Sequence, residues 1–280
     1  MVVLVTGASG QLGQSLQFIA PKYPEIQFVF ASSSDLDITN PERVTSFFET
    51  NTIDFCINAA AYTAVDKAET EVEKAHLVNV VGPKNLAIAC QKSGSTLVHI
   101  STDFVFDGEG NLPYSENHTT NPIGVYGQTK LEGEIEVAQN CDKHFIIRTS
   151  WVYSQFANNF MKTMLRLGSE RDELNVVADQ IGTPTNAVDL AEAIVTIIKS
   201  KNNEFGVYNF SNEGVCSWYD FAKEIFRINA INIQLNPIPT EAYPTPAKRP
   251  KYSVLDKSKI KNTFKIEIKS WQESLLQTKI

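Results

Sequence analysis

A glycine-rich turn directly after an apolar run constrains the fold of this chain more than any other sequence feature. Residues 2–5 are apolar, and Gly7, Gly10 and Gly13 follow with the spacing G-x-x-G-x-x-G. This spacing allows a tight turn, a close approach of backbone to a pyrophosphate, and close packing of the next helix on the strand. The free N–H groups at that helix N-terminus would attract phosphate. We therefore expect a nucleotide-binding βαβ unit. Its expected cofactor contacts are Gly7, Gly10, Gln11, Leu12 and Gly13.

The first half of the chain alternates short apolar runs with longer segments of helical pattern. The apolar runs, which we interpret as buried parallel strands, are 2–5, 28–31, 55–58, 97–101 and 145–149. The helical segments between them include 41–50, 72–93 and 129–139. This alternation predicts an α/β fold with a Rossmann-type doubly wound parallel sheet and a smaller C-terminal substrate-binding lobe. We expect an NAD(P)-binding domain at 1–150 and 176–213, and the lobe at 151–175 and 214–280.

Composition narrows the partners and the compartment. The chain has 280 residues and a formal net charge of -7, which argues against a nucleic-acid partner, because phosphate neutralisation needs a basic face. No apolar run is long enough to span a bilayer, and signal-peptide cleavage would remove the glycine turn. The four cysteines are scattered without a CxxC pair, and the four histidines lack metal-site spacing. We expect a cytoplasmic protein without a membrane partner, a disulfide framework or a metal site.

Cofactor choice depends on the residues that follow the second apolar run. The sequence there is Ala31-Ser32-Ser33-Ser34, without the acid that NAD enzymes place at this point to hold the adenosine ribose. The serines can donate to a 2′-phosphate, but no arginine stands beside them in the sequence. NADPH is therefore the favoured cofactor, and NADH remains possible. We expect Asp37 either to cap the loop or helix that follows or, with Ile38, to meet the adenine through the neighbouring backbone.

Tyr126 and Lys130 form a Y-x-x-x-K pair on one face of a predicted helix. A carbonyl reduced by hydride must receive a proton on oxygen, and a free tyrosine, with a pKa of about 10, is a poor acid–base group near neutrality. A lysine ammonium one turn away would lower that pKa, and the same lysine can hydrogen-bond the nicotinamide ribose. The strand before it ends in Ser101-Thr102-Asp103, where a hydroxyl can polarise a carbonyl. We assign Thr102 to this role, with Ser101 as the less favoured choice.

Two further segments are candidates for contacts to ligands. Ala59, Ala60 and Ala61 follow an apolar strand, and such small side chains would let the cofactor approach closely, although ordinary tight packing also explains them. Segment 237–250 contains five prolines and is therefore expected to be an extended loop. We interpret it as a substrate-covering loop, with a plain surface connection as the alternative.

These motifs together resemble the dTDP-4-dehydrorhamnose reductase family of the extended short-chain dehydrogenase/reductase superfamily. The resemblance covers nearly the whole chain, since it extends to segments 58–69, 148–153, 179–185 and 244–250. It implies an NAD(P)H-dependent oxidoreductase that reduces the 4-keto group of dTDP-4-dehydro-L-rhamnose to give dTDP-L-rhamnose, a precursor of surface polysaccharides. The catalytic residues that it implies are Thr102, Tyr126 and Lys130.

The resemblance also implies a set of substrate contacts. Trp151 would flank the sugar in the cleft between the lobes, with a core aromatic as the alternative reading of this residue. Arg249 would hold the dTDP pyrophosphate in the fixed fork of its guanidinium group. The remaining expected substrate contacts are Thr102, Asp103 and Tyr126. Some family members form metal-linked dimers through acids near positions where this chain has Ser15 and Val188, so we expect no metal and a monomer or weak homodimer.

Two other functions remain as alternatives. A nucleotide-sugar dehydratase or epimerase of this superfamily would carry an Asp-Glu pair after the strand-end threonine, but Phe104 follows Asp103 here. A non-catalytic NADP-binding regulatory subunit would have no need of an acid catalyst, and the complete set of catalytic residues argues against it. Lys67 and Glu69 are assigned no catalytic role.

Overall fold

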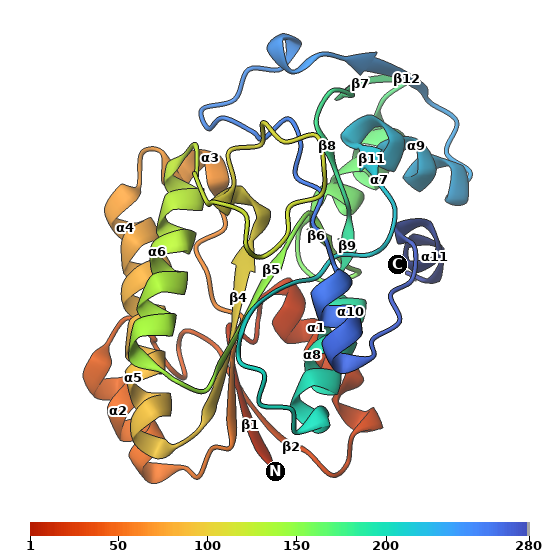
Figure 1. Ribbon diagram of the computed structural model, residues 1–280. Coiled ribbons are helices and arrows are strands. Elements are labelled where there is room, and N and C mark those ends of the chain that lie inside the picture. Colours follow the sequence, from red (N-terminus) through yellow and green to blue (C-terminus); the bar gives the residue numbers. More distant parts are fainter. Residues whose placement is uncertain (279–280) are drawn as a thin grey trace.

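The computed structural model describes residues 1–278 and is built around a six-stranded parallel sheet (Figure 1). The strand order is β10-β5-β4-β3-β1-β2, so β1 lies inside the sheet and the chain leaves it in both directions. The predicted Rossmann-type sheet is therefore confirmed. The six strands are β1 (Val2–Thr6), β2 (Gln27–Ala31), β3 (Phe55–Asn58), β4 (Thr96–Thr102), β5 (His144–Thr149) and β10 (Gly206–Asn209).

Helices cover both faces of the sheet, because the strands are apolar on both sides. Val3 and Val5 pack toward α1 (Gln11–Ile19) and α8 (Ala187–Ser200), whereas Leu4 packs with residues of α2 (Pro41–Thr50) and α5 (Gly82–Ser93). All three side chains are fully buried. Successive strand residues point to opposite faces, so one continuous apolar strand contributes to two cores. Helix α6 (Val125–Asn140) packs beside α5 on the same face as α2.

Three predicted boundaries were wrong in ways that bear on the site. Segment 72–93 is not one helix: α4 (Val72–His76) leads into a π-helical turn (Leu77–Val81) before α5. Pro83 lacks the N–H that would continue an α-helical ladder, and this favours the irregular turn. Helix α6 begins at Val125 rather than at residue 129, so Tyr126 lies in its first turn. Strand β4 extends to Thr102, and the sixth strand, β10, was not predicted.

A smaller lobe stands beside the carboxyl edge of the sheet (Figure 1). Its core contains Tyr153, Met161, Leu174, Phe221 and Trp271. The elements after β5 other than α8 and β10 are β6 (Val152–Tyr153), α7 (Phe160–Glu170), β7 (Glu173–Val177), β8 (Ile181–Gly182), β9 (Thr185–Asn186), β11 (Cys216–Ser217), α9 (Trp218–Ile228), β12 (Gln234–Ile238), α10 (Ser258–Phe264) and α11 (Trp271–Gln277).

One helix of the predicted lobe packs elsewhere. Ile260 and Phe264 of α10 belong to the core around α8 and β5, although they fall within the range 214–280. The remaining domain boundaries stay a prediction. The short elements are α3 (Val65–Ala68) and 3₁₀ turns at Ala20–Lys22, Asp103–Val105 and Thr240–Ala242. Within residues 1–278, no helix combines the length and the apolar character that crossing a membrane requires.

Candidate active site

The glycine turn connects β1 to α1, and its three glycines have different reasons to lack a side chain. A Cβ on Gly7, whose φ is +69°, would lie 2.6 Å from the Ala60 nitrogen, so this glycine lets the ends of β1 and β3 approach each other. A Cβ on Gly13 would lie 2.5 Å from the Gly7 carbonyl oxygen. A Cβ on Gly10 would meet only that oxygen, at 3.3 Å, and Gly10 is exposed. Protein packing thus explains Gly7 and Gly13, and Gly10 remains available for close approach of a ligand.

The N-terminus of α1 offers backbone rather than side chains to a ligand. Gly10 is its N-cap and supplies no side-chain cap, so the first N–H groups have no capping acceptor there. Gln11, predicted to contact the cofactor, directs its side chain to the smaller lobe: Nε2 donates to the Val152 carbonyl at 3.2 Å, and Oε1 accepts from Ser154 and Asn159 at 3.0 Å each. Any cofactor contact of Gln11 is therefore expected through its N–H group. The Leu12 side chain is buried in the core, so any cofactor contact of Leu12 is also expected through its N–H group.

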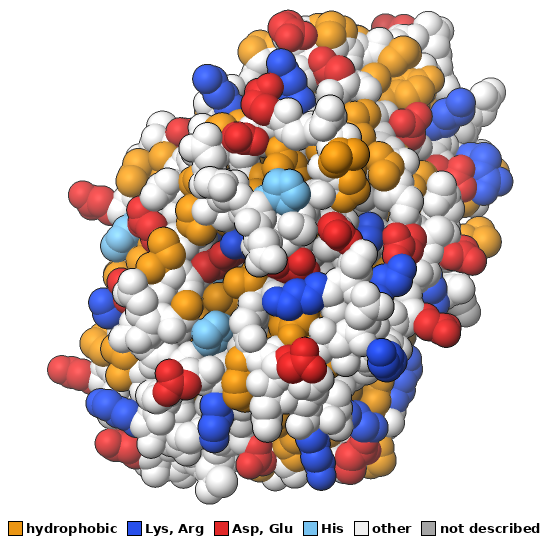
Figure 2. Space-filling view, viewed as in Figure 1, with side chains coloured by type: hydrophobic (Ala, Val, Ile, Leu, Met, Phe, Trp, Pro, Cys, Tyr) orange, Lys and Arg blue, Asp and Glu red, His pale blue; other side chains and the backbone are white. Residues whose placement is uncertain are grey.

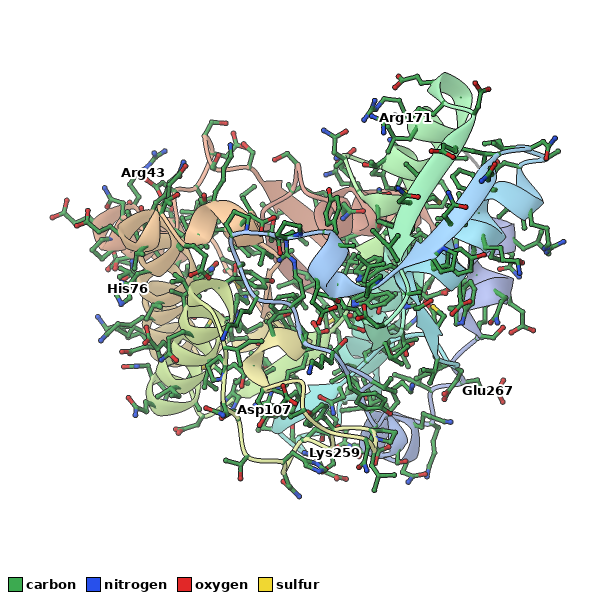
Figure 3. All side chains as sticks on the ribbon, turned by 90° about the horizontal axis from the view of Figure 1, so that it is seen from above. Arg43, His76, Asp107, Arg171, Lys259 and Glu267 are labelled. Carbon is green, nitrogen blue, oxygen red and sulfur yellow. The ribbon has the colours of Figure 1, made fainter. Side chains whose placement is uncertain are left out.

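The turn after β2 has a basic neighbour that is near in the fold but not adjacent in the sequence. Arg43 on α2 directs Nη2 to the carbonyl oxygens of Ser34 and Asp35, at 3.4 and 3.3 Å, so the fold places an arginine beside the serines although none adjoins them in the sequence. Figure 3 shows Arg43 on α2 at the edge of the molecule. The Ser32 hydroxyl donates to the Asp35 carboxylate at 2.6 Å, and that carboxylate also accepts from the Ser32 N–H. These bonds hold the pKa of Asp35 below its ordinary value.

The next two predicted cofactor residues serve the local backbone. The Asp37 carboxylate accepts from the N–H and hydroxyl of Thr39, at 3.0 and 2.7 Å, and so caps the turn before α2. The helix itself is capped by Asn40. The Ile38 carbonyl accepts from Asn85 at 2.9 Å, and its side chain is buried. Of the two alternatives for Asp37, capping is therefore seen, and a backbone contact to adenine stays a prediction.

Asn58 ties the ends of three neighbouring strands together. Its Oδ1 accepts from the Thr6 hydroxyl at 2.8 Å and from the Ala60 N–H at 3.2 Å, and its Nδ2 lies 3.1 Å from Nδ1 of His99. The side chain is buried. The alanines that follow, Ala59 to Ala61, are partly exposed beside the glycine turn. Their small side chains leave this part of the sheet edge open, as a cofactor site requires.

The three predicted catalytic residues meet at the carboxyl end of β4. Thr102 ends the strand, and its hydroxyl donates to Asp103 at 3.0 Å and hydrogen-bonds the Tyr126 phenol. The Lys130 ammonium, one turn along α6 from Tyr126, donates to the Ile100 carbonyl at 2.6 Å. The parallel sheet delivers Thr102 and the glycine turn to the same edge, because all six strands point the same way.

Burial sets the protonation of the tyrosine and the lysine. It raises the pKa of Tyr126 to about 12, although the Thr102 hydrogen bond lowers it. Burial lowers the pKa of Lys130 to about 8, and the charge of Glu134 opposes this shift. The expectation that Lys130 lowers the tyrosine pKa was therefore wrong for this structure, since desolvation disfavours the phenolate more than the hydrogen bond favours it. Tyr126 is protonated near neutrality, which is the form a proton donor needs.

Asp103 is a second acid, beside Thr102 and Tyr126. Its carboxyl is 2% exposed, and burial raises its pKa to about 6. Oδ1 accepts from Thr102, whereas Oδ2 meets no partner with hydrogen-bond geometry, even though the nearby Ser253 hydroxyl offsets part of the burial effect. A buried oxygen without a partner is unfavourable unless a ligand supplies one. Asp103 is therefore suited to accept a hydrogen bond from a substrate hydroxyl.

The less favoured hydroxyl, Ser101, is already committed to a structural network. It donates to the Glu134 carboxylate, which also forms a buried ion pair with Arg148 at 2.6 Å. Since the ion pair lies in the interior, the Ser101 hydrogen bond helps to satisfy a carboxylate that would otherwise be costly to bury. The Thr102 hydroxyl instead contacts Asp103 and the Phe104 N–H, outside this ion-pair network, which favours Thr102 over Ser101 for a ligand contact.

Glu69, which was given no catalytic role, caps α6, the helix that carries Tyr126 and Lys130. Its Oε1 accepts from the Val125 N–H at 2.9 Å, one residue before Tyr126, and so caps α6. A Cβ on Gly127 would lie 2.2 Å from the Phe104 carbonyl oxygen, so this glycine brings the helix against the end of β4. The sequence offered one signal: no capping side chain precedes α6, so its acceptor had to come from elsewhere in the chain.

Trp151 lies at the junction between the sheet and the smaller lobe. Its backbone has φ of +47°, an uncommon conformation for a large residue, and its indole stacks on Trp218 with ring centroids 3.6 Å apart. A Cβ on Gly182 would lie 2.7 Å from the Trp151 ring, so Gly182 makes room for it. Trp218 was not identified from the sequence. The indole is partly exposed, which fits a substrate contact better than a closed core position, and that contact stays a prediction.

Segment 237–250 crosses from the lobe to the carboxyl edge of the sheet (Figure 1). It is not loop throughout, because residues 237 and 238 belong to β12 and residues 240–242 form a 3₁₀ turn. Its end contacts α3, where Arg249 pairs with Asp66 at 2.7 Å. Since α3 follows β3, this contact lies on the same side of the sheet as the glycine turn, as a substrate-covering role requires.

The surface gives no sign of a polyanion site on the face in view. Figure 2 shows acidic and basic side chains interspersed over that face rather than gathered in a basic patch. Among residues 1–278, no three histidine, cysteine or acidic side chains are placed to hold a metal ion. The side chains gathered at the end of β4 carry hydroxyl, carboxyl and ammonium groups, and they lie at the same sheet edge as the glycine turn.

Comparisons with known proteins agree over nearly the full chain. The family model described as RmlD substrate binding domain matches residues 1–279. A dTDP-4-dehydrorhamnose reductase of Aggregatibacter actinomycetemcomitans is 44% identical, with 98% of this chain and 96% of that protein covered. A crystal structure of a dTDP-4-dehydrorhamnose reductase from Clostridium acetobutylicum superposes with a TM-score of 0.95 at 45% identity and covers 99% and 98% of the two chains. The Bacillus anthracis dTDP-4-dehydrorhamnose reductase, solved in complex with NADP, superposes with a TM-score of 0.95 at 42% identity and covers 99% of this chain and 98% of that chain.

Proposed function

Because this chain belongs to the RmlD substrate binding domain family, whose similar members are dTDP-4-dehydrorhamnose reductases, we propose that it reduces the 4-keto group of a dTDP-linked sugar with NADPH. The substrate that fits best is dTDP-4-dehydro-L-rhamnose, and the product is dTDP-L-rhamnose. One observation carries the proposal: Thr102, Tyr126 and Lys130 converge at the same sheet edge as an exposed Gly10 whose missing side chain protein packing does not explain.

The side chains at the end of β4 suit the proton half of this reduction. NADPH, when bound, supplies a hydride to the C4 carbon of the sugar, and the keto oxygen must then gain a proton. Tyr126 is protonated near neutrality and donates that proton. The Thr102 hydroxyl, which already hydrogen-bonds the phenol, holds the same oxygen and stabilises the charge that develops on it. Together the hydride and the proton convert the ketone into the hydroxyl group.

Lys130 has two tasks in this proposal. With a pKa of about 8 it is mainly protonated near neutrality, so its ammonium can stabilise the tyrosine after proton donation. It is 2% exposed and fixed to the Ile100 carbonyl, which leaves further N–H donors for the nicotinamide ribose. A single side chain thereby serves both the acid catalyst and the cofactor.

The residues present fit NADPH. The pyrophosphate would lie against Gly10 and the uncapped N-terminus of α1. Arg43 stands beside the Ser32–Ser34 turn, where a 2′-phosphate would find a guanidinium group and serine hydroxyls. The NADP bound to the Bacillus anthracis relative supports this choice. NADH lacks the phosphate and would gain nothing from Arg43, so we propose it as the weaker cofactor.

Three further side chains are the proposed contacts to the substrate. Arg249 would bind the diphosphate, Trp151 would flank the sugar, and Asp103 would accept from a sugar hydroxyl through its oxygen without a protein partner. The dehydratase alternative lacks its acid, because the residue after Asp103 is Phe104, whose ring packs edge-on against Tyr126. A cytoplasmic location and a monomer or weak homodimer stay predictions.

The test is the loss of NADPH absorbance when dTDP-4-dehydro-L-rhamnose is added, with the product identified as dTDP-L-rhamnose by mass and retention. A UDP-linked 4-keto sugar serves as the control for the nucleobase. Oxidation of NADPH with the dTDP-sugar supports the proposal. Tight binding of NADPH without oxidation by any 4-keto nucleotide sugar would instead support the regulatory-subunit alternative.

A further inference from the structure

Asp66 accepts two hydrogen bonds from segment 237–250, the proposed substrate-covering segment. Its Oδ2 accepts from Arg249 Nη2 at 2.7 Å, and its Oδ1 accepts from the Ala247 N–H at 3.2 Å. The two partners lie about 180 residues further along the chain, and Ala247 itself is buried. One carboxylate on the short helix α3 therefore fixes both the backbone and the arginine of a segment rich in proline.

The pair does not have the character of a stabilising ion pair. The Asp66 side chain is 40% exposed, and exposed pairs contribute little to the stability of a fold. Its geometry instead leaves most of the arginine available. Asp66 occupies one nitrogen of a group with five N–H donors, and within residues 1–278 Arg249 makes no other side-chain hydrogen bond. The remaining donors of the guanidinium can bind a phosphate in a forked arrangement.

The segment around Arg249 touches both walls of the catalytic site. After Arg249, Pro250 packs on Gly108, the Tyr252 N–H donates to the Gly108 carbonyl at 3.0 Å, and Ser253 lies beside Asp103. On the other side, the residue after α3 is Glu69, the cap of the catalytic helix. The residues that follow Arg249 thus contact the loop after β4, and its partner Asp66 lies on the short helix that directly precedes the cap of α6.

We propose that Asp66 is a positioning residue that orients Arg249 toward the diphosphate of the substrate. The inference rests on the proposed function, because it assigns Arg249 a nucleotide-sugar diphosphate. A free arginine loses much side-chain freedom when it binds, and a partner that orders it beforehand removes part of that cost. This gain exceeds the repulsion between Asp66 and the diphosphate, because the carboxylate lies on the Nη2 side of the guanidinium and the diphosphate takes the other donors.

The experiment measures the binding of dTDP by calorimetry to the full-length protein. The variants are Asp66→Asn, Arg249→Ala and the double variant. Asp66→Asn keeps an oxygen for the Ala247 N–H and removes the charge that holds Arg249. Glu170→Gln is the matched control, since it also removes one negative charge from an exposed pair with an arginine, Arg166. Unchanged melting temperatures show that the variants are folded.

We expect Asp66→Asn to weaken dTDP binding about tenfold, Arg249→Ala to weaken it further, and the double variant to match Arg249→Ala. In turnover, Asp66→Asn should raise KM for the dTDP-sugar and leave kcat and the NADPH dissociation constant unchanged. Wild-type or tighter dTDP binding by Asp66→Asn would overturn the inference, and so would a further loss when it is added to Arg249→Ala. Failure of the wild type to bind dTDP would overturn the proposed function, and with it this role for Asp66.

Discussion

The glycine turn and the end of β4 lie on one edge of the sheet but present different chemical groups. At the turn the backbone is exposed because side chains are missing, and a Cβ on Gly7 or Gly13 would collide with backbone. At the end of β4 the proposed catalytic groups are side chains whose pKa values burial has shifted, upward for Tyr126 and downward for Lys130. A substitution at the turn should therefore alter cofactor binding by filling the space that the cofactor needs. A substitution at the end of β4 should alter turnover by changing which groups are protonated.

Gly10→Asp should have the largest effect on NADPH binding. It places a side chain and a negative charge where the pyrophosphate must approach, and a like charge at about 4 Å costs about 4 kcal/mol near a protein surface. We expect NADPH affinity to fall roughly 100- to 1,000-fold, measured by fluorescence titration. Gly13→Ala should instead lower the melting temperature, because its Cβ would lie 2.5 Å from the Gly7 oxygen. NADPH affinity unchanged in Gly10→Asp would show that no phosphate binds at this turn.

Lys130→Met should impair both turnover and NADPH binding. It keeps most of the side-chain volume and removes the ammonium that serves the tyrosine and the ribose. We expect kcat to fall about 100-fold and NADPH binding to weaken as well. Because burial lowers the pKa of Lys130 to about 8, wild-type turnover should fall as the pH rises through about 8, where the ammonium loses its proton. A variant that loses turnover but binds NADPH normally would leave Lys130 only one of its two roles.

Asp103→Asn should reveal the electrostatic cost of burial at β4. The folded pKa of Asp103, about 6, lies above the ordinary value of 3.8, so the folded state binds this proton more tightly than the unfolded state. The resulting stabilisation is present below pH 4 and is lost as the pH rises to about 6. Asparagine does not titrate. The difference in free energy of unfolding between variant and wild type should therefore shift by about 2–3 kcal/mol in favour of the variant from pH 4 to pH 7. Parallel curves from urea unfolding would contradict the shift.

Arg43→Ala should give the smallest and most selective change. Losing one charged hydrogen-bond donor to the 2′-phosphate should weaken NADPH binding about tenfold and leave NADH binding unchanged. Arg171→Ala is the matched control, because Arg171 is also exposed and lies on the smaller lobe, away from Arg43 (Figure 3). Equal losses for NADPH and NADH would mean that Arg43 supports the turn after β2 rather than reading the phosphate.

The sequence predicted the parts of the molecule that local patterns control. Apolar runs identified five of the six strands of the parallel sheet, and the glycine spacing identified the turn, because both depend on neighbouring residues. Tyr126 and Lys130 could be predicted as a catalytic pair for the same reason, since they are one helical turn apart. Thr102 was found because it ends an apolar run. For these parts the pattern and the chemistry lie in the same short segment.

The contacts that the sequence did not predict join segments that only the folded chain brings together. Arg43 reaches the turn after β2 because α2 folds back along it, and Asp66 meets Arg249 across most of the chain. Glu69 reaches the start of α6 from 56 residues away. The pKa of Tyr126 went in the opposite direction to the prediction, because spacing shows which charge is near but not how much water burial removes.

Single-turnover NADPH oxidation measures whether Tyr126 donates the proton to the keto oxygen. Wild type and Tyr126→Phe, each saturated with NADPH, are mixed with dTDP-4-dehydro-L-rhamnose, and deuterated NADPH shows whether hydride transfer limits the observed rate. The substitution keeps the ring and removes only the proton donor. The rate should fall by about 100- to 10,000-fold, while the NADPH dissociation constant stays close to the wild-type value. A Tyr126→Phe variant that transfers hydride at the wild-type rate would show that Tyr126 is not the acid.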